Sequence, residues 1–271
     1  MATKVDLQIT QAQGWRLGLK NLLSRENGKW WGTSRWWTQA LIWMVITNGV
    51  LLLLLFLLPF ITATFEGVNP EDLEDIPDGI TAFFSLAGIS MPIGVVILLQ
   101  GSVIDEKTLG TAEWVLSKPV SRTAFIVSKL VAHSLGILVT YVLLQSTIAY
   151  GLIALSQNKL ISVGGFIKGA GLLALLLFFY LTLTLMLEVL FDKRGTVLGV
   201  ALGAALGGAL LVNLFPGLAL ITPFAFPNMI PAIVQGLVPI NFQILLPLIS
   251  TALMSLIFFS VAIWRFNHKA L

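Results

Sequence analysis

Six long apolar runs decide what this chain can fold into, because each is long enough to cross a lipid bilayer. A helix needs roughly 20 apolar residues, at about 1.5 Å each, to cover the ~30 Å hydrocarbon core. Inside lipid the backbone amides of a segment must be satisfied internally, so each run is predicted to be a helix. The six predicted spans are residues 38–64, 82–104, 130–155, 166–190, 196–221 and 244–264.

The composition supports a membrane protein and argues against a soluble one. Of the 271 residues, 57% are hydrophobic and 11% are charged, whereas soluble domains carry about 25% charged residues. The chain has no cysteine, which excludes disulfides and thiolate metal sites. We therefore predict an all-α integral membrane protein in which residues 1–271 form a single transmembrane domain.

The sixteen basic residues are distributed unequally between the two sides of the predicted spans. Fourteen fall on one side, in residues 1–36, 105–129, 192–194 and 265–269, which leaves Lys159 and Lys168 on the other. The positive-inside rule then places both termini in the cytoplasm. The expected location is the plasma (inner) membrane.

The lead, residues 1–36, is predicted to contain an amphipathic helix. Between residues 15 and 25, Trp15, Leu19 and Leu22 share one side, and most of the cations face the other. This pattern is typical of a helix that lies in the headgroup layer. An amphipathic helix packed on protein is the alternative interpretation.

Residues 222–243, before the last predicted span, are apolar but contain four prolines. Proline interrupts helical hydrogen bonding, so this segment cannot form one continuous helix. We predict a broken, re-entrant segment that acts as a lid on the outer side.

Glycine recurs at every fourth position in the fifth predicted span, at Gly195, Gly199, Gly203 and Gly207. Small residues at this spacing let another helix approach closely in lipid. Gly199, Gly203 and Gly207 are therefore predicted to lie at a dimer interface. Packing within the same chain is the alternative.

The sequence shows no nucleotide-binding, catalytic or metal-binding motif. There is no phosphate-binding loop, so the chain is not expected to hydrolyse ATP by itself. The two histidines are far apart, and no catalytic, cofactor-binding or metal-binding residues are predicted. Glu188 is the one acidic residue within a predicted span. It lies one turn from Asp192, Lys193 and Arg194, so we expect pairing near the cytoplasmic boundary; a proton relay is the alternative.

The polar loop 105–129 joins the second and third predicted spans. Gly110 and Pro119 are predicted to bound a short helix that carries Trp114. Ser117 or Ser121 is expected to cap a helix start, which leaves Arg122 free for a carboxylate. Near the two span ends, Glu106 and Lys129 are expected to pair and fix the angle of the loop.

The same loop resembles the signature loop of type-2 ABC transporter permeases. The resemblance covers an acidic–basic pair, Gly-Thr, Leu-Ser-x-Pro-Val-Ser-Arg and a downstream lysine. It implies that the loop supplies a coupling helix to a cytoplasmic ATPase. The implied coupling residues are Glu106, Gly110, Thr111, Trp114, Ser117, Pro119, Ser121, Arg122 and Lys129.

The resemblance implies a permease subunit of an ABC exporter, with no catalytic activity of its own. Two cytoplasmic ATPase subunits would bind the ATP, and a second permease, identical or related, would complete the path. The apolar sequence favours a hydrophobic or amphipathic substrate. An ATP-independent scaffold or channel and an integral-membrane enzyme are the alternatives.

Overall fold

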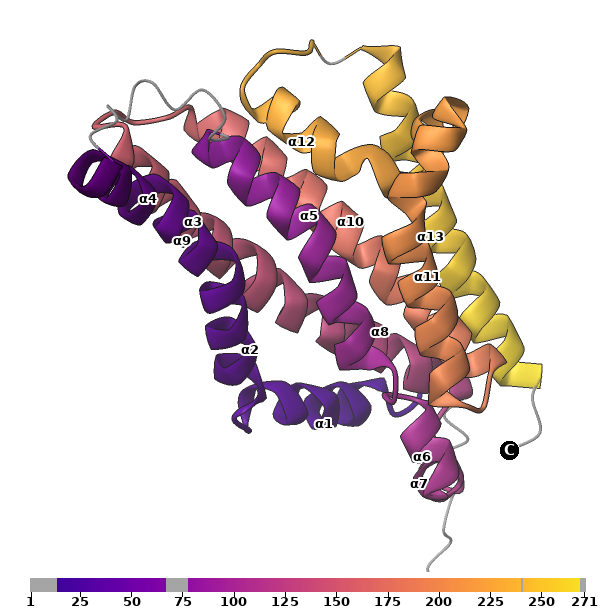
Figure 1. Cartoon of the computed structure of the whole chain (residues 1–271). Helices are drawn as coiled ribbons and strands as arrows, with labels where there is room; N and C mark the ends of the chain where they lie inside the picture. Colours follow the sequence, from indigo (N-terminus) through magenta and orange to yellow (C-terminus); the bar gives the residue numbers. More distant parts are fainter. Residues whose placement is uncertain (1–13, 67–77, 240, 269–271) are drawn as a thin grey trace, which may run out of the picture.

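The computed structural model describes residues 14–66, 78–239 and 241–268, and within these ranges it contains helices and no strand (Figure 1). The α-helices are α1 Leu19–Trp31, α2 Arg35–Trp43, α3 Val50–Leu52, α4 Leu58–Ile61, α5 Gly79–Leu99, α6 Ile104–Thr108, α7 Thr111–Leu116, α8 Arg122–Ile137, α9 Leu144–Ser156, α10 Val163–Leu190, α11 Arg194–Leu214, α12 Phe226–Val234 and α13 Phe242–His268. Four π-helical segments continue these rods: η1 Met44–Gly49, η2 Leu53–Leu57, η3 Thr62–Glu66 and η5 Leu138–Leu143.

Five helical rods in the described part of the chain are long and apolar enough to cross a membrane. They are Arg35–Thr64, Gly79–Thr108, Arg122–Ser156, Val163–Leu190 and Phe242–His268. The predicted all-helical, multi-pass architecture is therefore confirmed. The fifth predicted span corresponds to α11, Arg194–Leu214, which is not among these five rods. The arrangement with six spans thus stays a prediction.

Polar contacts join four helix ends, in two pairs, at one end of the bundle. The Asn267 amide of α13 donates to the Thr123 hydroxyl of α8 over 3.2 Å, and Arg194 at the start of α11 pairs with Asp105 of α6. Figure 1 shows α1, α6, α7 and the C-terminal end of α13 at this same end. We call it the charged end of the bundle.

Helix α1 lies across the charged end and packs on α8. It begins at Leu19 and ends at Trp31, so the predicted amphipathic stretch 15–25 ends too early. Its buried side chains are Leu22, Glu26 and Trp30, which makes packing on protein the observed arrangement for this face. The Trp30 ring fits because α8 carries Gly136 there, where an added Cβ would lie 2.4 Å from the ring.

The segment before the last span is broken, as its prolines predict. Within residues 222–243 it contains the 3-10 turn η7 Pro223–Ala225 and the nine-residue helix α12. The 3-10 turn η6 Pro216–Leu220 precedes it, so helix α11 ends before the predicted end of the fifth span at residue 221. Helix α12 lies across α5 and α10 at the end opposite the charged end (Figure 1). The Ser85 hydroxyl of α5 donates to the Pro227 carbonyl of α12 over 3.0 Å and holds it there.

Candidate functional site

Helix α6 carries three consecutive charged residues, Asp105, Glu106 and Lys107, directly after the long apolar helix α5. Each of the three contacts a different neighbouring element. Because charges next to the hydrocarbon layer are costly unless paired, this concentration marks the place where the bundle is fixed to the loop. We call α6 the root of the projecting segment, residues 104–118.

Glu106 is the centre of a buried ion-pair cluster. Its Oε1 atom lies 3.0 Å from Lys129 Nζ of α8 and 2.6 Å from Lys29 Nζ of α1. Lys129 is 1% exposed and Glu106 is 7% exposed. The predicted pairing of Glu106 with Lys129 is therefore confirmed. Burial makes this pairing obligatory, because an unpaired charge at this depth is strongly destabilising.

Helix α1 supplies the rest of the cluster, which the sequence does not predict. Arg25 lies 3.4 Å from Glu106, and Glu26 lies 2.8 Å from Lys29 and 3.6 Å from Lys129. These residues stand about eighty positions before Glu106 in the sequence, so no local spacing connects them. The alternation of Arg25, Glu26 and Lys29 on one helix is the signal that could have indicated a paired face.

The other two charges of the root bind the opposite side of the bundle. Asp105 pairs with Arg194 of α11. The Lys107 ammonium donates to the Glu188 carbonyl over 2.7 Å and lies 3.2 Å from the Asp192 carboxylate. The root is therefore tied to α1, α8, α10 and the α10–α11 turn at once.

The expected pairing of Glu188 with its sequence neighbours Asp192, Lys193 and Arg194 is wrong. The Glu188 carboxylate accepts a hydrogen bond from the Ser102 hydroxyl over 2.6 Å and one from the Val103 backbone N–H over 3.3 Å. Both donors lie at the bend between α5 and α6, and Val103 directly precedes the first residue of α6, a position whose N–H the helix itself does not pair. The carboxylate thus stabilises the start of α6.

The tip of the projecting segment, residues 109–118, is exposed on one face only, because Ala112 and Val115 are buried. Gly110 adopts φ +68°, a left-handed conformation that suits glycine, and α7 begins at the next residue, Thr111. Leu109 is 78% exposed and Trp114 is 61% exposed. The Lys118 ammonium lies 3.8 Å from the centroid of the Trp114 ring. Figure 1 shows α6 and α7 extending beyond the long helices.

The end of the loop is attached to the lead and to α8. Of the two candidate caps, Ser121 is the one observed: its Oγ atom accepts from the Ala124 N–H over 2.9 Å at the start of α8. Its own N–H donates to the Leu17 carbonyl over 3.1 Å. Ser117 instead donates to the Trp114 carbonyl at the end of α7, and the exposed Pro119 lies between the two helices.

Arg122 is not free for a carboxylate of a partner, so this expectation is wrong. Its guanidinium donates to the carbonyls of Phe266 and Asn267 over 3.4 and 3.3 Å. These carbonyls belong to the last turn of α13, where helix ends leave acceptors unpaired and carry partial negative charge. Arg122 thus joins the start of α8 to the end of α13.

The glycine repeat of α11 faces away from the rest of the described chain. A Cβ atom added at Gly195, Gly199, Gly203 or Gly207 would meet no atom within 4 Å. Gly208 differs, because its added Cβ would lie 2.3 Å from the Phe224 ring. Close packing within the described chain therefore explains Gly208 and does not explain the repeat.

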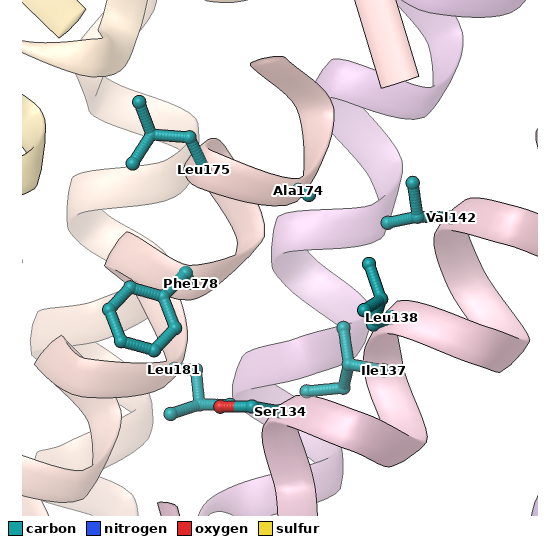
Figure 2. Close-up of a pocket in the computed structure, with 8 residues that line it drawn as sticks. All are labelled: Ser134, Ile137, Leu138, Val142, Ala174, Leu175, Phe178 and Leu181. Atoms are coloured by element: carbon teal, nitrogen blue, oxygen red, sulfur yellow. The ribbon is translucent and has the colours of Figure 1, made fainter. Parts of the chain in front are cut away.

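An apolar cavity of about 290 Å³ separates α8 and η5 from α10 (Figure 2). Figure 2 shows Ala174, Leu175, Phe178 and Leu181 of α10 beside Ile137, Leu138 and Val142, with one hydroxyl, that of Ser134. The lining has no acid or base that could take part in proton transfer. It offers an apolar surface.

Five apolar rods of spanning length and a charged end define the class: an all-helical, multi-pass membrane protein. A family model with the description "Protein of unknown function (DUF2705)" matches residues 36–270, and the chain belongs to this family. No curated protein matches the chain.

Proposed function

We propose that the chain is the permease subunit of an ABC exporter, driven by separate cytoplasmic ATPase subunits. The observation that carries the proposal is the contrast within the projecting segment. A root whose charges bind four elements holds a short helix with an exposed tryptophan and leucine at its tip. This is the arrangement expected of a lever that receives a push from a soluble partner.

The root supports the proposal because it connects the tip to the long helices rigidly. Displacement of α7 would act on α8 through Glu106 and Lys129, and on the α10–α11 turn through Lys107. Packed cores and ion-paired junctions transmit displacement as rigid bodies, whereas a slack loop would dissipate it.

The tip supports the proposal because its side chains are those of a docking surface. Tryptophan is enriched at the centres of protein interfaces, and Trp114 is 61% exposed here. The residues proposed to contact or orient the ATPase are thus centred on Gly110, Thr111 and Trp114. Arg122 and Lys129 act behind them, within the bundle.

A second permease copy is proposed to pack on α11. Its open glycine face at Gly199, Gly203 and Gly207 allows close helix approach. The substrate is proposed to be hydrophobic or amphipathic, because the cavity of Figure 2 is lined by aliphatic and aromatic side chains. Both termini are proposed to lie in the cytoplasm of a plasma-membrane protein.

The test is affinity purification of the tagged full chain from its native membrane in mild detergent, followed by an ATPase assay of the eluate. Since the chain has no phosphate-binding loop, ATPase activity in the eluate reports a partner. The Leu109→Ala, Trp114→Ala double variant is expected to lose at least tenfold of that activity.

The matched control is the Leu160→Ala, Trp264→Ala variant. Leu160 is 78% exposed and Trp264 is 60% exposed, so the control removes equal apolar surface elsewhere. Equal ATPase activity for both variants would remove the coupling role of α7. Absence of ATPase from the wild-type eluate would favour an ATP-independent scaffold or channel.

A further inference from the structure

A groove between the first and second rods continues into a polar pocket at the charged end. The groove, about 370 Å³, lies between α2–η1 and α5. The pocket, about 310 Å³, lies between α1, α2, the end of α5 and the start of α11. Ile97 and Leu98 line both, so the two cavities form one continuous surface.

The polar pocket contains one cation, Arg35, that makes no ion pair with a carboxylate among the described residues. Three basic and two acidic side chains line it. Lys29 pairs with Glu106, and Arg194 pairs with Asp105. Arg35 instead donates to the Leu98 carbonyl over 3.3 Å, and its guanidinium carbon lies 4.8 Å from the Trp30 ring centroid. The uncompensated charge of the pocket is therefore positive.

The groove has the depth of one leaflet. Its α2–η1 side runs from Arg35 at the mouth to Ile46, eleven residues or about 16 Å at ~1.5 Å each. This is about half of the ~30 Å hydrocarbon core. An occupant with its polar group at Arg35 would end near the middle of the bilayer.

Along α5 the groove runs from Ser90 to Leu98, about 12 Å. Its lining is mostly apolar, with Gln39 and Ser90 as the polar members. Trp43 forms the floor, held against Gly94, where an added Cβ would lie 1.9 Å from the ring and thus cannot be accommodated.

We propose that this surface binds an anionic phospholipid, with the phosphate at Arg35 and one acyl chain in the groove. Arginine binds phosphate through two parallel hydrogen bonds, and basic pockets between transmembrane helices on the cytoplasmic side are typical lipid headgroup sites. In this proposal the exposed side chains of Ile42 and Ile97, which form the walls of the groove, contact the acyl chain of the lipid. The site does not depend on an ATPase partner.

The test is native mass spectrometry of the full chain, purified in detergent and incubated with equal amounts of phosphatidylglycerol and phosphatidylethanolamine of identical acyl chains. The wild type is expected to retain one phosphatidylglycerol in preference to phosphatidylethanolamine. Arg35→Gln is expected to reduce that preference about tenfold, because the charge-assisted bonds to phosphate are lost. Ile97→Trp is expected to reduce retention of both lipids by filling the groove.

Two controls separate a built site from general lipid contact. Arg265→Gln removes a positive charge at the charged end outside the pocket, and Ile89→Trp enlarges a residue of α5 that is as exposed as Ile97, at 52%. Both are expected to retain lipid as the wild type does. Because Ile97→Trp leaves Arg35 in place, it tests the groove even where Arg35→Gln prevents folding.

Three results would overturn the proposal. One is retention of both lipids in equal amounts by the wild type. Another is an equal loss of preference with Arg35→Gln and Arg265→Gln. The third is undiminished lipid retention by Ile97→Trp. If this variant also loses a dimer that the wild type forms, the groove is a contact between helices of two copies.

Discussion

The root and the tip of the projecting segment are adjacent in sequence and opposite in character. In the root, Glu106 and Lys107 are held by buried or partly buried partners on several helices. In the tip, Leu109 and Trp114 are mostly exposed. The difference teaches that the cost of unpaired charge explains the contacts of the root, whereas contacts within the described chain do not explain the exposed side chains of the tip. We propose that a partner binds them.

Removal of the central carboxylate of the root should have the largest effect on stability. Glu106→Ala leaves Lys129 buried with Glu26 at 3.6 Å as its remaining acidic partner, and we expect a loss of about 3 kcal/mol. This loss of stability is measured by thermal unfolding in detergent, with tryptophan fluorescence as the signal. Glu113→Ala, on the exposed side of α7, is the control and should change little. Equal melting temperatures for the two variants would contradict the assigned role of the root.

Glu188→Ala tests the root from the α10 side and should have the second largest effect. The change leaves the Ser102 hydroxyl and the Val103 N–H without their acceptor, at an expected cost of about 2 kcal/mol. The same unfolding measurement applies. Ser102→Ala should recover part of the stability in the Glu188→Ala background, because one unpaired donor is then absent. An additive loss in the double variant would exclude the proposed bond.

Gly110→Ala acts at the boundary between root and tip. Gly110 has a positive φ, and a residue with a Cβ atom is about 1 kcal/mol less stable in that conformation. We expect a small fall in melting temperature and a larger fall in co-purified ATPase activity, because α7 would leave its orientation. Gly28→Ala, in α1, is the control: an added Cβ there meets nothing within 4 Å, and its φ is not positive. An unchanged ATPase yield with Gly110→Ala would show that this turn does not set the orientation of α7.

Trp114→Ala should have the smallest effect on stability, within about 0.5 kcal/mol, because the side chain is mostly exposed. Its effect on partner binding should be the largest of the single tip variants, since aromatic residues dominate protein interfaces. Thermal unfolding and ATPase co-purification, measured on the same preparation, separate the effect on stability from the effect on partner binding. A marked loss of stability would mean that Trp114 packs on the bundle, and the comparison of root and tip would fail.

Much of this division follows from local sequence. Gly110 before a short helix, Ser121 as a helix cap, and a Glu106–Lys129 pair near two span ends depend on residue chemistry at known spacing. Arg122 shows where such reasoning fails. Its hydrogen bonds go to the neutral carbonyls of Phe266 and Asn267 at the end of α13, far along the chain, instead of to a carboxylate.

The sequence by itself determined that this protein is helical and multi-pass, because lipid leaves a long apolar segment no other way to satisfy its backbone. It also determined which end carries the charge. Only the tertiary structure decided that α1 enters the Glu106 cluster, that Glu188 holds the start of α6, and that the α11 glycines remain uncovered by the described chain. These contacts join segments far apart in sequence, and their energy depends on distance and burial, which residue spacing does not encode.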